Sequence, residues 1–372
     1  MQQDTYSLLR ELVAIRSVFP HEQALAAYIT SELCALGFTV KNCMVTKERS
    51  NIIATYGTAK TYLGFYGHMD TVPPDVHYTQ DPFTILRKGT RAHGLGVADM
   101  KGGLAAILRL AAVAAAEQLP VKLVFGVDEE NISLGAHALV DQSMLNDVDF
   151  LISGESGQVK NERQGYSVCF GRRGRIAIKV TVRGKKAHAA ESQKAVNAIE
   201  MAGRLITHLD QLSFAHNPHF GTTNLVIHEI SGSTDSFSVP DECSFMLSAL
   251  TAPPTRHTEV IHQLSSLAKK LGVQADIMPL SRPTPYGDSY EVSQSNAFLQ
   301  RIQKEVFVAD SVVPAYVESI ADENIFANRL GIPVISVGPI GGGDHTAYEW
   351  VDVRSIDNVA ACYAKILRLY TS

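Results

Sequence analysis

Four short apolar runs, each followed by a histidine or a carboxylate, constrain this chain more than any other feature of its sequence. They occupy residues 62–70, 121–130, 148–155 and 333–345. Runs of this length with helical stretches between them predict buried strands of a mostly parallel α/β sheet with helices on both faces. Such sheets bind ligands beyond the carboxyl ends of their strands. We therefore expect two histidines and several carboxylates to meet at one sheet edge, as in a hydrolytic metal site.

The composition is that of a globular protein. Of its 372 residues, 45% are hydrophobic and 19% charged, so a large core can form. The formal net charge of −5 argues against nucleic acid or an anionic membrane as the main partner. The most apolar stretch, residues 104–116, is too short to span a bilayer, and the N-terminal segment predicts an amphipathic helix rather than a signal peptide. Scattered cysteines suit a reducing compartment. We expect a soluble, cytoplasmic protein.

The pattern of helices and strands changes near residue 174, which predicts an interrupted domain. Residues 1–173 alternate helix and strand, and the alternation resumes over residues 283–372. Between them, residues 174–282 follow the order β-α-β-β-α-β of a ferredoxin-like unit. We predict an α/β catalytic domain formed by the first and last segments, with a smaller α+β domain inserted in it.

The first apolar run supplies a candidate metal ligand together with a group to orient it. His68 and Asp70 are two residues apart at a strand end and should face the same side. A ligand histidine usually donates its second ring N–H to a carboxylate, so His68 is the expected ligand and Asp70 its partner. Asp99 stands between a glycine-containing loop and an alanine-rich helix. It could cap that helix, bridge two cations, or do both.

Three adjacent acids stand at the mouth of the second run: Asp128, Glu129 and Glu130. They could form a solvated turn, but clustered carboxylates repel one another unless cations hold them or one stays protonated. Neighbouring acids here could divide the work, one ligating a metal and the other acting as general base. Glu155 ends the third run, and His345 lies in a glycine-rich loop. This number of ligands is natural for two divalent ions around a catalytic water.

Five motifs together resemble the co-catalytic metallopeptidase family of acetylornithine deacetylase, succinyl-diaminopimelate desuccinylase, aminoacylase and glutamate carboxypeptidase. In chain order they are GHMDTVPP, ADMKGG, DEENISLGA, GES and GGGDHTAYE. The resemblance covers nearly the whole chain. It implies a metal-dependent amidohydrolase that cleaves the amide bond of a small N-acyl amino acid or a short peptide. A carboxypeptidase or dipeptidase of the same family is the alternative, and a non-catalytic binding protein on the same fold is a third possibility.

The resemblance also implies a role for each candidate residue around two divalent cations, with Zn²⁺ expected and Co²⁺ or Mn²⁺ as alternatives. The ligands would be His68 and Glu155 for one cation, Glu130 and His345 for the other, and Asp99 as a bridge. Metal-bridged water would attack the amide carbonyl. Glu129 would be the general base, and Asp70 would orient His68.

The inserted segment carries a further motif of the family, residues 183–190. The resemblance implies that His188 reaches an active site, often that of the partner subunit, and stabilises the tetrahedral oxyanion. A surface histidine between a strand and a helix is the alternative. The same domain usually mediates dimerisation, so we expect a homodimer formed through residues 174–282.

Two positions of the inserted segment depart from the family pattern. Phe237 stands where many relatives carry asparagine, and Leu250 stands where the family has an arginine that clamps a substrate carboxylate. Such a contact contributes about 1.5–3 kcal/mol. Either another arginine replaces it or the substrate lacks a carboxylate at that place. The candidate replacements are Arg172, Arg173 and Arg256.

Overall fold

The computed structural model divides the chain into two compact units. It describes residues 4–157, 165–234, 236–308 and 312–372. The first unit comprises Met1–Gly171, Val292–Tyr316 and Ala321–Ser372, and the second comprises Arg172–Glu291 and Val317–Ile320. An α/β unit with a smaller α+β unit inserted in its sequence confirms the predicted fold class.

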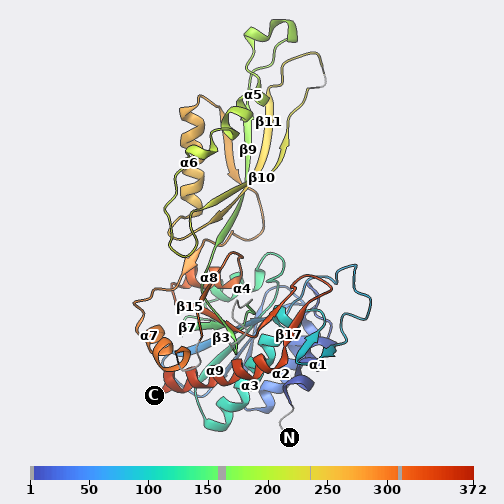
Figure 1. Cartoon of the computed structure of the whole chain (residues 1–372), viewed down its shortest axis with the longest axis vertical. Helices are drawn as coiled ribbons and strands as arrows, with labels where there is room; N and C mark the ends of the chain where they lie inside the picture. Colours follow the sequence, from blue (N-terminus) through green and yellow to red (C-terminus); the bar gives the residue numbers. More distant parts are fainter. Residues whose placement is uncertain (1–3, 158–164, 235, 309–311) are drawn as a thin grey trace. The chain divides into compact units, whose positions relative to one another are not determined.

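Helices and a large sheet build most of the first unit (Figure 1). The helices are α1 (Thr5–Ala14), α2 (Gln23–Ala35), α3 (Gly102–Glu117), α4 (Leu134–Asp141), α7 (Ala297–Ile302), α8 (Asp322–Leu330) and α9 (Val353–Thr371). Among the described residues, eight strands of the large sheet lie wholly or mostly in this unit: β1 (Thr39–Met44), β2 (Ser50–Tyr56), β3 (Tyr62–His68), β6 (Val121–Gly126), β7 (Val148–Ser153), β8 (Ser167–Arg172), β14 (Ala315–Val317) and β15 (Val334–Gly338). A smaller sheet contains β4 (Leu86–Lys88), β5 (Arg91–His93), β16 (Gly341–Gly342) and β17 (Trp350–Asp352).

The four apolar runs become the centre of the large sheet. Strands β6, β3, β7 and β15 are neighbours in that order and run parallel. Strands β2 and β8 flank them and run antiparallel to them, and β1 pairs antiparallel with β2 at the edge of the sheet. Both β3 and β6 are buried along their whole length. A strand covered on both faces is apolar throughout, which is why these runs do not alternate. Because the central strands share one direction, their carboxyl ends meet at one edge.

Helices cover both faces of the large sheet (Figure 1). On one face α3 packs on β3 and against α1, α2 and α9, and on the other α4 and α8 pack together against β2 and β15. Ten of the sixteen residues of the alanine-rich helix α3 are buried. Its small side chains allow it to lie close to the sheet, as expected for the most apolar stretch of the chain.

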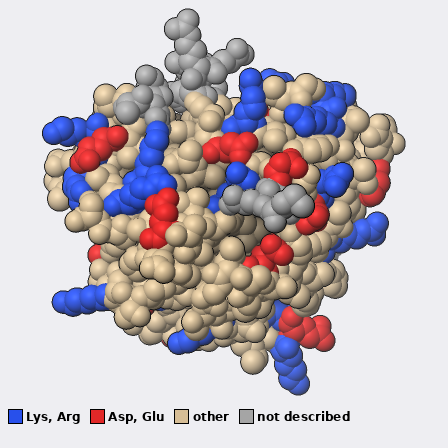
Figure 2. All heavy atoms as spheres, turned by 90° about the horizontal axis from the view of Figure 1, so that it is seen from below, with Lys and Arg blue, Asp and Glu red and all other residues tan. Residues whose placement is uncertain are grey.

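The surface seen in Figure 2 mixes charges of both signs. Basic and acidic side chains alternate over this face, and a large part of it carries neither. Among the described residues, no helix combines the length and apolar character that crossing a membrane requires.

The second unit has the element order predicted for it. Its elements are β9 (Gly174–Arg183), α5 (Ala198–Ile206), β10 (Asn224–Ser231), β11 (Glu242–Thr251), α6 (His257–Lys270) and β12 (Ala275–Pro279). The strands form an antiparallel sheet in the order β10-β11-β9-β12. Alternate residues of β9 are buried, and Val180, Phe245 and Leu264 belong to the core under α5 and α6. Strand β10 is left at the edge of the sheet.

Gly103 lies where the start of α3 closely approaches the end of β7. A Cβ atom built on Gly103 would lie 2.2 Å from the carbonyl oxygen of Gly154, which directly follows β7. A contact this short leaves no room for a side chain, so only glycine fits without a shift of the backbone. The approach brings the start of α3 next to the residue that follows Gly154, which is Glu155.

We predict that Gly103→Ala lowers the free energy of unfolding of the first unit by about 1–3 kcal/mol, because the backbone must move to admit the methyl group. Trp350, the single tryptophan, lies on β17, so its fluorescence during urea unfolding reports this unit. The control is Gly203→Ala in α5, where nothing lies within 4 Å of the added Cβ. It should leave the Trp350 transition unchanged. An unchanged transition for Gly103→Ala would contradict the close approach.

Candidate metal centre

The carboxyl ends of three adjacent parallel strands carry the first residues of the site. His68 is the last residue of β3, and Glu155 lies two residues beyond β7. Glu129 and Glu130 follow β6, which neighbours β3. The parallel register therefore brings the candidates of three different motifs to one edge, as the sequence pattern predicted.

Two further residues come from the loops beside this edge. Asp99 lies in an irregular helical turn, Val97–Lys101, between β5 and α3, where it leaves the helical conformation. His345 lies in the loop between β16 and β17, with a positive φ of 63°. The short sheet that contains β5, β16 and β17 thus joins the two loops that supply Asp99 and His345.

These residues form two clusters that share Asp99. The first contains His68, Asp99 and Glu155, and the second contains Asp99, Glu130 and His345. In each cluster one possible ligand atom per residue lies within 4.8 Å of the others. Nε2 of His68 is 2.9 Å from Asp99 Oδ1 and 3.2 Å from Glu155 Oε1. Nε2 of His345 is 3.3 Å from Asp99 Oδ2 and 3.0 Å from Glu130 Oε2.

Asp70 lies behind His68, fully buried. His68 Nδ1 is 3.0 Å from the backbone oxygen of Asp70 and 3.6 Å from its carboxylate, so the backbone oxygen is the nearer acceptor for the Nδ1 proton. This contact leaves Nε2 directed into the first cluster. The Asp70 carboxylate accepts hydrogen bonds from the backbone N–H groups of Glu129 at 3.3 Å and Glu130 at 3.0 Å. Asp70 therefore ties the His68 strand end to the acid pair.

The side chain of Glu349 supports Asp99 and was not identified from the sequence. It is 2% exposed, and its carboxylate accepts hydrogen bonds from the backbone N–H groups of Gly96, Ala98 and Asp99 at 2.7, 2.8 and 3.1 Å. These three bonds fix the turn that presents Asp99. The only sequence signal was the place of Glu349 at the end of the GGGDHTAYE motif.

Two acids at the start of α8 were also not identified from the sequence as part of the site. Asp322 and Glu323 are fully buried, whereas acids in the first turn of a helix are ordinarily placed there by the helix dipole. The hydroxyl of Tyr66 donates to Asp322, and Ser336 Oγ donates to Glu323 at 2.8 Å. Burial raises the pKa of Asp322 to about 7. These acids add negative charge to the region behind the two clusters.

The two clusters contain more carboxylates than positively charged side chains, and the pKa values of their members are shifted. Burial, followed by the charge of Asp99, raises the pKa of Glu155 to about 7. Burial raises the pKa of Glu129 well above its usual value, and Asp322 and Glu155 raise it further. Hydrogen bonds to Asp99 and Glu130 raise the pKa of His345 to about 10. Each of these shifts favours the protonated form of the group.

The donor set fits divalent metal ions. Each cluster offers one imidazole nitrogen and two carboxylates, which are ligands that Zn²⁺, Co²⁺ and Mn²⁺ accept. Glu130 Oε1 is buried without a hydrogen-bond partner among the described residues, and such an atom ordinarily has one. A cation in each cluster would satisfy the unpaired oxygen and relieve the repulsion between the carboxylates.

The remaining candidates lie outside the two clusters. Glu129 is partly buried beside Glu130 and belongs to neither cluster. Asp128, the first acid of the run, pairs with Arg49 at 2.8 Å instead. His188 belongs to the second unit, where it is exposed, and its Nδ1 accepts a hydrogen bond from the backbone N–H of Ala190.

Arg173, one of the candidates to replace the arginine missing at Leu250, lies beside that residue in the second unit. The guanidinium of Arg173 donates to the backbone oxygens of Leu250 at 3.3 Å and Thr222 at 2.9 Å, and also to Phe220 and Glu318. Arg173 is 7% exposed. Its donors are therefore used to hold β11 to neighbouring loops, which gives it a structural function at this place.

Proteins similar to this chain are found both by sequence and by structure. A succinyl-diaminopimelate desuccinylase of Pseudoalteromonas translucida is 24% identical over 379 residues, covering 99% of both chains. One of Acidiphilium cryptum is 33% identical over 213 residues, 56% of each chain. A tripeptidase structure from Staphylococcus aureus covers 100% of this chain and 99% of its own, with a TM-score of 0.77 and 23% identity. A dinuclear metal-binding peptidase of the M20 family from Bacillus subtilis covers 99% of this chain and 97% of its own, with a TM-score of 0.75 and 15% identity.

The family model for peptidase family M20/M25/M40 matches residues 64–369. That range begins within β3 and ends within α9, so it includes every residue of both clusters and the second unit. The chain therefore belongs to peptidase family M20/M25/M40 and is a hydrolase that acts on amide bonds.

Proposed function

We propose that the protein is a two-metal amidohydrolase that cleaves the amide bond of a small N-acyl amino acid or a short peptide. The observation that carries this proposal is the pair of ligand clusters joined through Asp99. A carboxylate whose two oxygens face two different clusters is suited to hold two cations a few ångströms apart. His68 and Glu155 complete one site, and Glu130 and His345 complete the other. We propose Zn²⁺ as the resident metal.

Glu129 is the proposed general base. Glu129 is the chain neighbour of Glu130 but belongs to neither cluster, and burial raises its pKa, which makes the carboxylate a stronger base than an exposed one. When bound, the cations would polarise the amide carbonyl and lower the pKa of the attacking water. Glu129 takes a proton from that water and delivers it to the leaving amine. Asp70 keeps His68 oriented while this happens.

The relatives and Leu250 support the proposed substrate class. The sequence relatives named above are desuccinylases, which favours a deacylase acting on an N-acyl amino acid. The structural relatives include a tripeptidase, and a short peptide presents the same amide bond. Because Leu250 replaces an arginine and Arg173 is held by backbone oxygens, we propose a substrate that makes no arginine–carboxylate contact at this strand.

We assign the catalytic role to residues 1–173 and 283–372, and a lid and dimerisation role to residues 174–282. In this proposal His188 stabilises the oxyanion of the tetrahedral intermediate. Its exposure supports a role that requires contact with a substrate. We also propose a cytoplasmic location, since the buried thiols of Cys43 and Cys243 form no disulfide.

Exposed apolar residues on β10 support a homodimer. Val226, Ile227 and Ile230 are 41, 37 and 54% exposed, and β10 is the terminal strand of its sheet. An exposed apolar edge strand is a template for pairing with a second chain. Pairing of two β10 strands would bury these residues.

We predict that Glu129→Gln lowers kcat by at least about 100-fold, since it removes the general base, and leaves the metal content unchanged. The measurement is hydrolysis of a panel of N-acetyl, N-succinyl and N-formyl amino acids and of dipeptides, after loading with Zn²⁺, Co²⁺ or Mn²⁺. Metal content is determined on the same samples by inductively coupled plasma mass spectrometry.

The matched control for this variant is Glu32→Gln, an exposed carboxylate on α2, which should retain full activity. Loss of metal from Glu129→Gln would assign Glu129 to the ligands instead. An active, metal-loaded Glu129→Gln enzyme would remove Glu129 from the reaction. Metal-loaded wild-type protein that cleaves no member of the panel would contradict the proposed substrate class.

We predict that the double variant Ile227→Lys, Ile230→Lys is monomeric in solution, because lysines on an edge strand oppose pairing. The molar mass is measured by size-exclusion chromatography with light scattering. Met44→Lys is the control, since Met44 is 64% exposed on β1, the terminal strand of the large sheet, and the variant should remain dimeric. A monomeric wild-type protein, or a dimer that survives both lysines, would contradict the assignment.

A further inference from the structure

A buried ion-pair network lies behind the loop that carries Glu129 and Glu130. Its members are Arg49, Glu22 and Asp128, which are 8, 1 and 0% exposed. Nε and Nη2 of Arg49 donate to the two carboxylate oxygens of Glu22 at 2.9 and 2.5 Å, and Nη1 donates to Asp128 Oδ1 at 2.8 Å. One guanidinium thus joins a residue that precedes α2 to a residue that follows β6.

Asp128 organises the loop after β6. Its φ of 73° is left-handed, which is unfavourable for a residue with a Cβ atom unless surrounding contacts hold it. Its Oδ2 accepts hydrogen bonds from the backbone N–H groups of Ile132 at 3.4 Å and Leu134 at 3.1 Å. Its backbone oxygen accepts one from the N–H of Ser133 at 2.8 Å. The turn at Asp128 therefore depends on where its carboxylate is held, and Arg49 holds it.

The next two residues of the loop are fixed from the opposite side. The backbone N–H groups of Glu129 and Glu130 donate to Asp70, the residue that also contacts His68. The direction in which Glu129 and Glu130 leave the sheet is thus set by two carboxylates. One is the carboxylate of Asp70, which also lies close to His68, and the other is the carboxylate of Asp128, which pairs with Arg49.

We propose that Arg49 is a positioning residue for the reaction. Arg49 orients the carboxylate of Asp128 and compensates its charge. It thereby sets the turn that directs Glu130 into the second cluster and Glu129 toward the substrate. The part that concerns Glu129 rests on the proposed function. The part that concerns Glu130 is a statement about metal binding and can be tested without a substrate.

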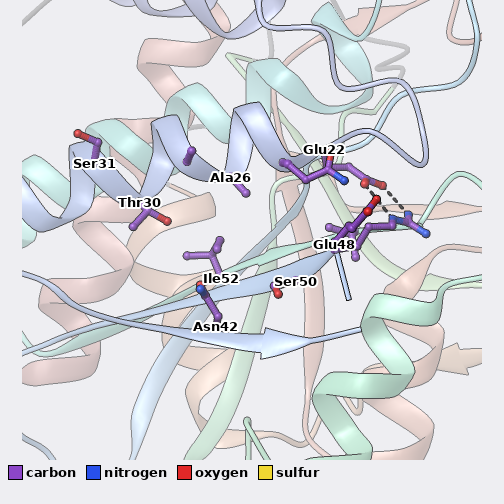
Figure 3. A pocket seen from close by; sticks show the side chains of 12 residues that line it. Glu22, Ala26, Thr30, Ser31, Asn42, Glu48, Ser50 and Ile52 are labelled. Carbon is purple, nitrogen blue, oxygen red and sulfur yellow. Dashed lines mark hydrogen bonds and ion pairs between the residues drawn. The ribbon is translucent and has the colours of Figure 1, made fainter. Parts of the chain in front are cut away.

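A cavity of about 440 Å³ lies between α2 and strands β1 and β2, and Arg49 and Glu22 are among the residues that line it. Figure 3 shows Glu22 at the cavity, with dashed lines marking its ion pair. Gln23, Ala27 and Glu48 also line it and are exposed, so the cavity reaches the surface. If the side chain of Arg49 is removed, a small planar cation can enter through this cavity and bind between the carboxylates of Glu22 and Asp128.

The test is the variant Arg49→Ala, studied by titration with Co²⁺ followed by its visible absorption, and by steady-state kinetics. We expect one Co²⁺ to bind as in the wild type, at His68 and Glu155, and the other to bind about 10- to 100-fold more weakly, as when a group supporting a ligand is lost. We expect kcat to fall by a similar factor with little change in KM.

Chemical rescue separates positioning from a general loss of stability. Methylguanidinium should restore both the second Co²⁺ affinity and kcat, because its planar fork can bridge Glu22 and Asp128 as Arg49 does. Methylammonium has the same charge without the fork and should restore little. The matched control is Arg368→Ala, which removes a bidentate pair with Glu117 at the surface (2.8 and 2.6 Å), and should leave metal binding and kcat unchanged.

If Arg49→Ala does not fold, Arg49→Lys gives the same comparison, since lysine keeps the charge but cannot bridge both carboxylates. Wild-type affinity for both metals and wild-type kcat in the folded variant would overturn the proposal. So would equal weakening of both metal sites, or a defect that methylguanidinium leaves in place. A wild-type protein that binds two metals but cleaves no tested amide would contradict the proposed function alone, because the metal titration still decides the role of Arg49.

Discussion

The structure depends on how one partly buried carboxylate, that of Asp99, is shared. Its two oxygens face His68 on one side and His345 on the other, and Glu155 and Glu130 stand close to the same histidines. Carboxylates at these separations repel one another strongly in a buried site. The fold brings them together because β3, β6 and β7 are parallel neighbours. Divalent cations would compensate this repulsion, and the same cations would supply the chemistry of amide hydrolysis.

Backbone N–H groups hold this arrangement in place. Glu349 accepts three of them on the turn that carries Asp99, and Asp70 accepts two on the turn that carries Glu129 and Glu130. Asp128, anchored by Arg49, accepts two more further along that loop. Carboxylates outside the clusters thus fix the loops on which the ligand-bearing side chains stand. This division explains why the site contains more acids than two metal ions need.

The residues of the two clusters could be predicted from the sequence, but the residues that hold them in place could not. His68, Glu130 and Glu155 could be placed together because apolar runs define parallel strands, and parallel strands end at one edge. The roles of Glu349 and Asp322 depend on contacts between segments far apart in the chain, so no local pattern shows them. Asp128 illustrates the same limit. Residue type alone does not distinguish three consecutive acids, whereas in the structure a left-handed φ and the ion pair with Arg49 separate Asp128 from Glu129 and Glu130.

The most direct test of the shared Asp99 carboxylate is anomalous X-ray scattering from crystals grown with Zn²⁺. We predict two strong peaks on either side of Asp99, one beside His68 and Glu155 and the other beside Glu130 and His345. A single peak, or two peaks that do not both contact Asp99, would contradict a two-metal centre bridged by this residue.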